Sequence, residues 1–461
     1  MRKIMKIKEL KKLKDKKIAI LGYWKEGKST LNFLLSIWIN NITILDKDET
    51  INKKEGINYV LWESYIDNLW DFELIFKTPW ISPYNPKITP FREKLSSQAN
   101  IFFNNYKWKV IWITWTKGKS TTVTLTYKIL KELWYNTKLV WNIWTPVLDE
   151  VDLLNNETHD FVIYELSSYM LETLKPKLFI WVLNNLYDCH LDWHNWKENY
   201  SNAKYNILKY SNYKLVNYEL KDNIKINRLD NIKYFWENWN YYYKNPLFYI
   251  NEQEVLRDKN IALNWEHNRK NISAVIWILD IIDNKNSSHN IISLKKVLNE
   301  FSWLEHRIED IWTYNWIIFI NDAIATTPES TIAAIKTFGE KIWTIFLWGQ
   351  DSGFQFEKLR KILEQYKIEN IVLFPDTWEK IFWDLWSHLY ETIFDLDLWI
   401  YKPKVLKTKS MEKAVDFGFK NTKEWKICIL SNAAPSFSLR TWYIQKWTQF
   451  KDAVKNYEIK K

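Results

Sequence analysis

The sequence predicts an α/β protein whose strands and helices alternate and form parallel, doubly wound sheets in three domains. The chain has 461 residues, 47% of them hydrophobic, which is enough for two or three domains with separate cores. Short apolar runs are followed by turn residues and then by helix-like runs, the order that builds a parallel sheet. Three such sets follow one another, so we expect domains over residues 1–106, 107–302 and 303–461.

The first set begins with a short apolar strand from Lys17 to Leu21, which is followed by a turn and a helix-like run from Ser29 to Ile37. A second strand, Ile42 to Leu45, ends at Asp46, and a third, Glu73 to Lys77, runs into the Pro-rich turn of residues 78–83. This alternation predicts parallel pairing of the strands.

The second and third sets repeat the pattern further along the chain. The segment from about Tyr210 to Tyr249, rich in Asn, Tyr and Lys, gives no clear assignment. The expected strands are 109–111, 161–164 and 178–180 in the second set, and 316–320, 342–347, 371–374 and 427–430 in the third.

Charge and cysteine content limit the class of protein. The formal net charge of +10, concentrated in the Lys-rich start, suits an anionic partner or an ordinary solvated surface. Cys189 and Cys428 stand too far apart for a metal motif or a disulfide framework, which favours a reducing compartment. The chain has neither a signal-peptide stretch nor the roughly 18 apolar residues of a membrane span. We therefore expect a soluble, cytoplasmic protein without stable membrane insertion.

Tryptophan and glycine occur in unusual numbers. The chain has 30 Trp and 8 Gly, whereas an average glycine usage of about 7% predicts roughly 32 glycines. Asn-Trp pairs stand where Asn-Gly would make a tight turn, and the pair Asn315-Trp316 precedes a β-rich run as a hairpin turn would. A bulky residue at positive φ costs on the order of 1–2 kcal/mol. Our hypothesis is that most of these tryptophans are glycines in the living protein, from a UGA codon read as glycine; the alternative is a truly Trp-rich chain.

A phosphate loop is predicted where a strand meets a helix. Backbone N–H groups in such a loop wrap phosphate oxygens, Lys119 reaches the terminal phosphates and Ser120 can hold Mg²⁺. Ile113 stands where the strict pattern has glycine, but with glycine at 112 and 115 the string reads GITGTKGKSTT. The candidate nucleotide-binding residues are Trp115, Thr116, Lys117, Gly118, Lys119, Ser120 and Thr121.

Three further residues stand where a metal site behind a phosphate loop would need them. Glu165 follows the expected strand 161–164, and His190 follows the next strand. Carboxylate oxygens suit a hard cation better than imidazole does. Lys204 lies 14 residues beyond His190. Taken singly, each has an ordinary alternative as a solvated Glu165, a capping His190 or a surface Lys204.

The N-terminal turn carries a weaker signal. Gly22-Tyr23-Trp24 begins a GxGxxG-like string if residue 24 is glycine, and Asp46 stands at the end of the second strand. Alone, this pattern would indicate a dinucleotide site and a nicotinamide-dependent oxidoreductase. That class leaves the phosphate loop unexplained. A non-catalytic nucleotide-binding module is the reading if the tryptophans are real.

Together these strings resemble the Mur ligases over most of the chain. The resemblance implies a Rossmann-like N-terminal domain that binds a UDP moiety, a central P-loop ATPase-like domain with a parallel sheet, and a Rossmann-like C-terminal domain. It also implies that Glu165, His190 and Lys204 serve catalysis and Mg²⁺, with Lys204 carbamylated. It further implicates Ser167, Asn142 and again His190 at the UDP substrate, Asn268, Asn271, Arg307 and Asp322 at ATP, and Thr326, Ser436 and Tyr443 at the amino acid.

The activity implied is ATP-dependent ligation of D-glutamate to UDP-N-acetylmuramoyl-L-alanine through an acyl phosphate, in peptidoglycan precursor synthesis. The closing string Gln445 to Phe450 is similar to that of the D-glutamate-adding member. The resemblance implies ATP and Mg²⁺ as cofactors, no nucleic-acid partner and a monomer. Another amino-acid-adding Mur ligase, or a folylpolyglutamate synthase-like ligase, remains the alternative.

Four positions depart from the family pattern. Cys189 replaces an Asp before His190, and Asn432 replaces a Pro. Ile324 stands where a Lys is common, and Ser352 where a basic residue often faces the incoming amino acid. The last two changes leave the amino acid as the open part of the assignment.

Overall fold

The computed structural model describes residues 13–459 apart from several internal stretches. The sheets, strand pairings and hydrogen bonds are those of the described residues. The excluded stretches are 107–108, 115–117, 141–144, 152–157, 173, 175, 177, 187–190, 209, 224–225, 227–228, 237–240, 245–246, 251–252, 258–265, 284–286, 302–308, 324, 326, 349–355, 375–402 and 435–441.

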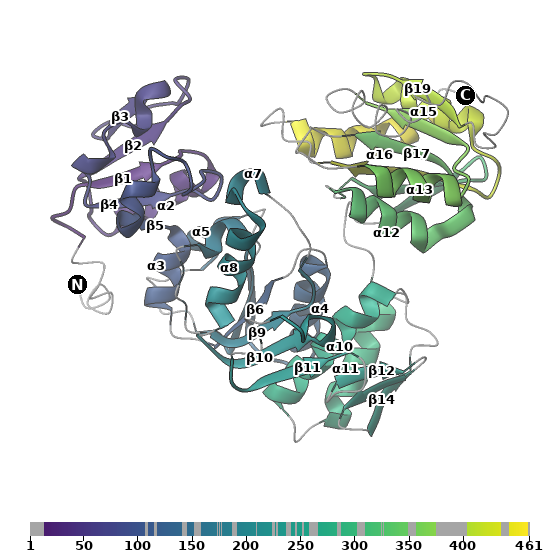
Figure 1. Cartoon of the computed structure of the whole chain (residues 1–461), viewed down its shortest axis with the longest axis horizontal. Coiled ribbons are helices and arrows are strands. Elements are labelled where there is room, and N and C mark those ends of the chain that lie inside the picture. The colour runs from purple at the N-terminus through teal and green to yellow at the C-terminus, as the bar shows by residue number, and fades with distance from the viewer. Residues whose placement is uncertain are drawn as a thin grey trace. The chain divides into compact units, whose positions relative to one another are not determined.

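The described chain forms three β-sheets with helices packed on them, so the predicted α/β fold class is confirmed (Figure 1). By its internal contacts the chain divides into two compact units, residues 1–301 and 302–461. The first unit contains two of the sheets and the second contains one. The division of the chain at 106 and 302 into three domains stays a prediction.

The first sheet has five parallel strands in the order β3-β2-β1-β4-β5. The three strands expected here are present, while helix α2 begins at Lys25, four residues before the expected Ser29. The elements are β1 (Ile18–Leu21), α2 (Lys25–Ser36), β2 (Ile42–Asp46), β3 (Asn58–Leu61), η2 (Glu63–Ile66), η3 (Leu69–Asp71), β4 (Leu74–Lys77), η4 (Thr89–Lys94), β5 (Leu95–Ser96) and α3 (Gln98–Asn105).

The second sheet has nine strands in the order β14-β13-β12-β11-β10-β9-β6-β8-β7, parallel from β7 to β12 and antiparallel beyond. Helices α4, α10 and α11 pack against one another beside it. Its strands are β6 (Lys109–Thr114), β7 (Thr137–Val140), β8 (Phe161–Glu165), β9 (Leu178–Leu183), β10 (Ser211–Asn217), β11 (Ile232–Phe235), β12 (Tyr241–Lys244), β13 (Leu247–Ile250) and β14 (Gln253–Arg257). Its helices are α4 (Lys119–Glu132), α5 (Val147–Glu150), α6 (Ser168–Leu171), α7 (Leu191–His194), α8 (Lys197–Leu208), η5 (Tyr218–Leu220), α10 (Glu266–Ile282) and α11 (Ser287–Glu300).

Among the described residues, the third sheet has six strands in the order β15-β16-β20-β17-β18-β19, and of these only the edge pair β15–β16 is antiparallel. Alternate residues of its strands enter two cores, one under α12 and α13 and the other under α15 and α16. The elements are β15 (Glu309–Tyr314), β16 (Ile317–Asp322), α12 (Pro328–Phe338), η7 (Gly339–Lys341), β17 (Ile342–Trp348), α13 (Glu357–Gln365), β18 (Asn370–Leu373), β19 (Lys404–Lys407), α15 (Met411–Asn421), β20 (Ile427–Ala433) and α16 (Trp442–Ile459).

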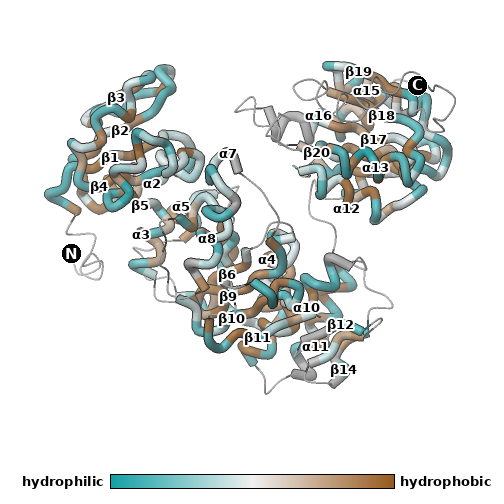
Figure 2. The backbone as a smooth tube through the Cα atoms, viewed as in Figure 1, coloured by the Kyte–Doolittle hydropathy of each residue, from teal (hydrophilic) through white to brown (hydrophobic). Residues whose placement is uncertain are grey.

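The apolar segments coincide with the inner strands of all three sheets (Figure 2). Every residue of β1 and β2 is buried, as are all but one of β6. Strands covered on both faces read as continuous apolar runs, which is why the sequence identified them.

The hairpin predicted around Asn315-Trp316 is confirmed. Tyr314 pairs with Ile317 across the antiparallel strands β15 and β16, so Asn315 and Trp316 alone form the turn. Their φ angles are 48° and 63°. A two-residue turn with both φ angles positive is the type that Asn-Gly forms with least strain.

Tryptophans occupy backbone conformations that favour glycine at other positions too. Six of the eleven described non-glycine residues with positive φ are tryptophans. Trp38 and Trp134 lie just beyond α2 and α4. In each case the N–H of the tryptophan and the N–H of the next residue donate to carbonyl oxygens of the last helical turn, the pattern that usually carries glycine. Trp62, with φ 76° and ψ −173°, lies in a region that only glycine normally enters.

Buried tryptophans show a second mismatch. Trp112 and Trp181 are fully buried partners across β6 and β9, and the indole N–H of each lacks an acceptor among the described residues. A buried donor without a partner costs about 1–3 kcal/mol. Both mismatches support the hypothesis that many of these positions are glycine in the living protein.

Candidate active site

The predicted phosphate loop lies between a strand and a helix of the second sheet. β6 ends at Thr114 and α4 begins at Lys119. Gly118 precedes the helix with φ 98° and ψ 1°, a conformation that glycine adopts without a Cβ clash. Ser120 and Thr121, in the first turn, are buried and Lys119 is half-buried. The free N–H groups at the start of this 14-residue helix can bind phosphate oxygens.

Glu165 stands beside the strand that opens the phosphate loop. It is the last residue of β8 and the register partner of Ile113, one residue before β6 ends. Its side chain is 1% exposed, and its Oε2 atom has no hydrogen-bond partner in the described chain. A buried carboxylate oxygen of this kind is costly unless it is paired, and it is a good ligand for a hard divalent cation.

Lys204 is buried on a neighbouring helix. Its side chain is 2% exposed, and Nζ lies 4.8 Å from the centre of the Tyr200 ring on the same helix, α8. Helix α8 packs against α6, which begins three residues after Glu165, and against α7. Within the part of the chain that the structure describes, no three His, Cys, Asp or Glu side chains gather as a metal site.

Two asparagines of the second sheet's helix α10 are buried close to its start. Asn268 and Asn271 are 2% and 1% exposed, and Asn271 Nδ2 donates to Asn268 Oδ1 at 3.3 Å. Asn271 in turn accepts a hydrogen bond from Asn184, the residue that follows β9. Sequence reasoning missed Asn184, although it follows an apolar strand just as Glu165 ends one.

The predicted N-terminal site lies where β1 meets α2. Gly22 has φ 91°, and a Cβ there would come within 2.3 Å of Thr78 Oγ1. Asp46, at the end of the adjacent strand β2, accepts the Tyr23 N–H at 2.6 Å through Oδ2 and the Asp48 N–H at 3.0 Å through Oδ1. The Asp46 carboxylate therefore holds the turn against the end of β2. Trp24 is 42% exposed beside it.

A buried lysine lies at the same edge of the first sheet, at the end of β4. Lys77, the last residue of β4, donates from Nζ to the carbonyl oxygens of Thr78 at 3.0 Å and Ile81 at 2.7 Å. Burial lowers the pKa of Lys77 to about 7, although the charges of Glu26 and Glu172 act in the opposite direction. Burial also raises the pKa of Glu26 to about 7, against the effects of Gln98 and Lys77.

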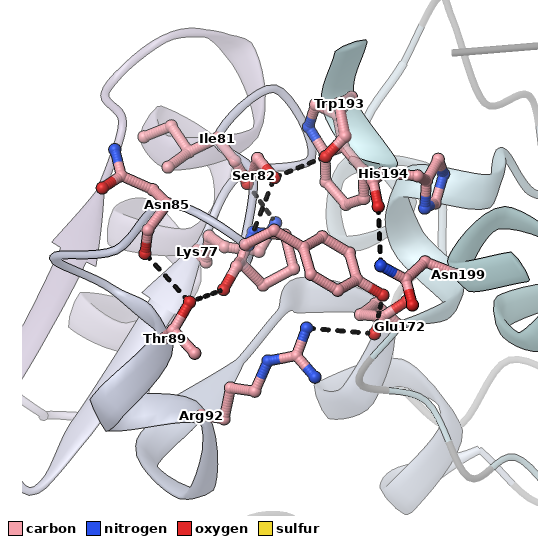
Figure 3. A network of polar contacts seen from close by, with 12 residues as sticks. Lys77, Ile81, Ser82, Asn85, Thr89, Arg92, Glu172, Trp193, His194 and Asn199 are labelled. Carbon is pink, nitrogen blue, oxygen red and sulfur yellow. Dashed lines mark hydrogen bonds and ion pairs between the residues drawn. The ribbon is translucent and has the colours of Figure 1, made fainter. Parts of the chain in front are cut away.

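The segment after β4, residues 78–92, bridges the first and second sheets, and we call it the bridging loop (Figure 3). Ser82 Oγ donates to the carbonyl oxygen of Trp193 in α7 at 2.6 Å. Tyr84 Oη donates to Glu172 Oε1 at 2.6 Å, just after α6. Arg92 pairs with the same oxygen at 3.4 Å and lies 4.4 Å from the centre of the Tyr84 ring. The loop thus contacts the segments that follow both Glu165 and His190.

His194 was also missed by sequence reasoning. Its side chain is fully buried, and Nε2 lies 3.0 Å from Ser168 Oγ, which joins α7 to α6. Ser167, a predicted substrate residue, is the N-cap of α6. The only feature of the sequence that could have indicated His194 is its closeness to His190.

Asp322 belongs to the second unit. It is the last residue of β16, is 5% exposed, and accepts a hydrogen bond from Ser431 Oγ at 3.1 Å. Ser431 Oγ also lies 2.9 Å from Thr331 Oγ1, so the carboxylate is held at the carboxyl edge of the third sheet. Strand ends at such an edge are where open α/β sheets bind ligands.

Several predicted residues lie outside the described residues, or have side chains that do. The departures Cys189, Ile324 and Ser352 are among them. The predicted site residues concerned are Trp115, Thr116, Lys117, Asn142, His190, Arg307, Thr326 and Ser436, together with the side chain of Tyr443. Of the helices described, none is long and apolar enough to cross a membrane.

Known proteins are similar to this chain along nearly all of its length. The family model described as "Mur ligase middle domain" matches residues 113–279. A UDP-N-acetylmuramoylalanine--D-glutamate ligase from Clostridium kluyveri is 30% identical over 464 residues, covering 96% of this chain and 97% of its own. Proteins of the same name from Clostridium beijerinckii and Clostridium botulinum are 29% and 28% identical, over 96% and 97% of this chain and 97% and 99% of their own lengths.

Solved structures share the fold. A UDP-N-acetylmuramate-alanine ligase from Thermotoga maritima has a TM-score of 0.60 at 18% identity, with 97% of this chain and 100% of that chain covered. A second ligase from the same organism, solved in complex with ADP, has a TM-score of 0.55 at 14% identity, with 97% of each chain covered.

Proposed function

Because this chain belongs to the Mur ligase family, we infer that it joins D-glutamate to UDP-N-acetylmuramoyl-L-alanine in a reaction driven by ATP. The observation that carries the phosphoryl-transfer step is the position of Glu165, whose buried carboxylate stands beside the strand that opens the phosphate loop. The acceptor and the amino acid follow from the full-length similarity to D-glutamate-adding ligases. The reaction supplies a peptidoglycan precursor.

The chemistry requires an activated carboxylate. The terminal phosphoryl group of ATP passes to the carboxylate of the L-alanine end, and ADP leaves. The amine of D-glutamate then attacks the carbonyl carbon; the C–N bond forms, the C–O bond to phosphate breaks, and the nitrogen loses a proton. The N–H groups at the start of α4 and the Lys119 side chain bind the phosphates and stabilise the transferring charge.

The residues present fit a magnesium ion. Glu165 offers a buried oxygen without a donor, and Ser120 stands in the first turn of α4. Mg²⁺, when bound, neutralises charge on the phosphates. His190 and a carbamylated Lys204 complete the proposed set, since a carbamate would give Lys204 the oxygen ligand that a hard cation prefers. The burial of Lys204 on a helix that packs on α6 supports this role.

The remaining assignments extend the proposal. The UDP substrate is bound by Gly22, Tyr23, Trp24, Asp46, Asn142, Ser167 and His190. ATP is bound by Asn268, Asn271, Arg307 and Asp322, and the amino acid by Thr326, Ser436 and Tyr443. The hydrogen bond from the Tyr23 N–H to Asp46 Oδ2, which holds the turn at the end of β2, supports the first of these groups. The enzyme acts as a monomer in the cytoplasm, in three domains, without a nucleic-acid partner.

Phosphate release tests the proposal. With ATP, Mg²⁺ and UDP-N-acetylmuramoyl-L-alanine present, D-glutamate should raise the rate of phosphate release, and L-glutamate should not. The product should have the mass of one added glutamate. Release that instead requires another muramoyl peptide, another amino acid or a folate would identify the alternative ligases and overturn the assignment.

A further inference from the structure

Four buried asparagines form a continuous hydrogen-bonded chain in the first unit. Asn217 Nδ2 donates to Asn184 Oδ1 at 3.0 Å, and Asn184 Nδ2 donates to Asn271 Oδ1 at 3.0 Å. Asn271 Nδ2 then donates to Asn268 Oδ1 at 3.3 Å. All four side chains are at most 2% exposed. We call this set the asparagine relay.

The relay has a fixed direction. Asn217 Oδ1 accepts the backbone N–H of Glu219 at 3.0 Å. A backbone amide can only donate, so this contact determines which end of the Asn217 amide is the oxygen. Each following amide must then accept with its oxygen and donate with its nitrogen. The orientation set at Asn217 is therefore transmitted through Asn184 and Asn271 to Asn268.

The last amide of the relay has an N–H group that donates to none of the described residues. Asn268 Nδ2 is buried and has no hydrogen-bond partner among the described residues. Since burying a donor without an acceptor is unfavourable, a bound molecule that supplies an acceptor atom would be favoured there.

The relay lies beside the phosphate loop. Thr114, the end of β6, pairs with Leu183 of β9, and Leu183 pairs with Val216 of β10. Asn184 directly follows β9 and Asn217 is the last residue of β10, so they stand at the same edge of the sheet as the loop. Neighbouring strands lie about 4.8 Å apart, which places the relay within the length of a nucleotide from the phosphates.

We propose that Asn184 and Asn217 are positioning residues that fix the Asn268 amide as a hydrogen-bond donor toward an acceptor atom on the nucleoside part of bound ATP. This proposal rests on the ATP-dependent function proposed above. Neither positioning residue touches the nucleotide; they act by excluding the amide orientation that would present the Asn268 oxygen instead.

An aspartate at position 184 tests the direction of the relay. Asn184→Asp keeps the size and still accepts from Asn217, but it cannot donate to Asn271. The Asn271 amide then turns its nitrogen to the new carboxylate, the Asn268 amide turns in response, and an oxygen faces the nucleoside. Asn184→Ala removes the link without this reversal. If the relay acts through orientation, the near-isosteric Asp variant binds ATP at least as weakly as the Ala variant.

The measurement is direct binding by calorimetry in the presence of Mg²⁺, without the other substrates. We expect ATP to bind about tenfold more weakly to both variants, as the loss of one hydrogen bond predicts. Tripolyphosphate, which has no nucleoside, should bind all proteins equally. Asn290→Ala is the matched control, because Asn290 is also buried in this unit and donates to the carbonyl of Asp283, just after the other end of α10, at 2.7 Å.

Each outcome decides the question. Unchanged ATP affinity in both Asn184 variants, or equal weakening of tripolyphosphate, overturns the relay. A weaker effect of Asp than of Ala would show a packing role only. If neither Asn184 variant folds, Asn271→Asp repeats the reversal at the next link and carries the same expectation. A parent chain that carries the native source's residues at positions 112 and 115 and binds neither ATP nor tripolyphosphate would contradict the proposed function itself.

Discussion

Replacing tryptophan by glycine should stabilise the chain at some positions and destabilise it at others. Trp62 and Trp134 have positive φ angles and exposed side chains, with 59% and 92% of their surface accessible. Trp70 is similarly exposed, at 62%, but lies in the short helix η3 and is absent from the positive-φ set. The three single variants Trp62→Gly, Trp134→Gly and Trp70→Gly therefore differ mainly in backbone conformation.

The magnitudes follow from the φ angles. Trp62 lies in the glycine-only region, where strain is about 1–3 kcal/mol, and Trp134 lies in the left-handed helical region, at about 1–2 kcal/mol. Glycine makes the unfolded chain more flexible, which offsets about 0.4–1 kcal/mol. We expect net stabilisation of about 1–2 kcal/mol for Trp62→Gly and about 0.5–1 kcal/mol for Trp134→Gly. Trp70→Gly should destabilise by about 1 kcal/mol.

Urea unfolding followed by circular dichroism measures the three midpoints against the parent chain. Equal destabilisation by all three substitutions would refute the strain argument. A mass spectrum of the peptide spanning residues 109–146, taken from the native source, tests directly whether these tryptophans are glycines in the living protein. Tryptophan at positions 112, 115, 141 and 144 would contradict that hypothesis.

Four further results are expected. Lys119→Ala should abolish ligation with an unchanged unfolding midpoint, since the lost contact is with phosphate; full turnover would exclude the phosphate loop from the reaction. Lys204→Ala should be nearly inactive and partly rescued by short carboxylic acids; normal activity with normal Mg²⁺ dependence would exclude the carbamate. Burial raises the pKa of Glu26 from 4.5 to about 7, so between these pH values the folded chain holds a proton that the unfolded chain lacks. Stability should therefore fall as the pH rises through that window, and Glu26→Gln should flatten this pH dependence of the unfolding midpoint. Tyr84→Phe removes the hydrogen bond to Glu172 and should raise the KM for the UDP substrate severalfold, with little change in the KM for ATP. Equal changes in both KM values would argue against a role of Tyr84 in placing the UDP substrate.

The parallel sheets and the phosphate loop could be predicted because their signals are local. Strands covered on both faces are continuous apolar runs, and the string at residues 114–121 is contiguous. The region of β10 to β13 gave no clear reading for two reasons. Strands β11 to β13 lie toward one end of the nine-stranded sheet, and β10, although central, has exposed residues in its first half. The start of α2 was placed four residues late, because residues 22–27 were interpreted as a turn.

The polar networks could not be predicted, because they depend on strand order. Asn184 and Asn217 lie 33 residues apart and meet only because β9 and β10 are neighbours. Tyr84 and Glu172 lie 88 residues apart and join two different sheets. No spacing rule brings such pairs together. By contrast, the hairpin at Asn315-Trp316 needed only two adjacent residues, and the sequence identified it.

The bridging loop has a thermodynamic consequence for how the two substrates affect each other's affinity. Its first residue, Thr78, packs against Gly22 at the predicted UDP site, and its later residues hold α6 and α7, which follow the predicted metal ligands. If a ligand at one end favours one position of the loop, it changes the free energy of binding at the other end. By linkage this effect is reciprocal: the factor by which the UDP substrate alters the affinity for ATP equals the factor by which ATP alters the affinity for the UDP substrate.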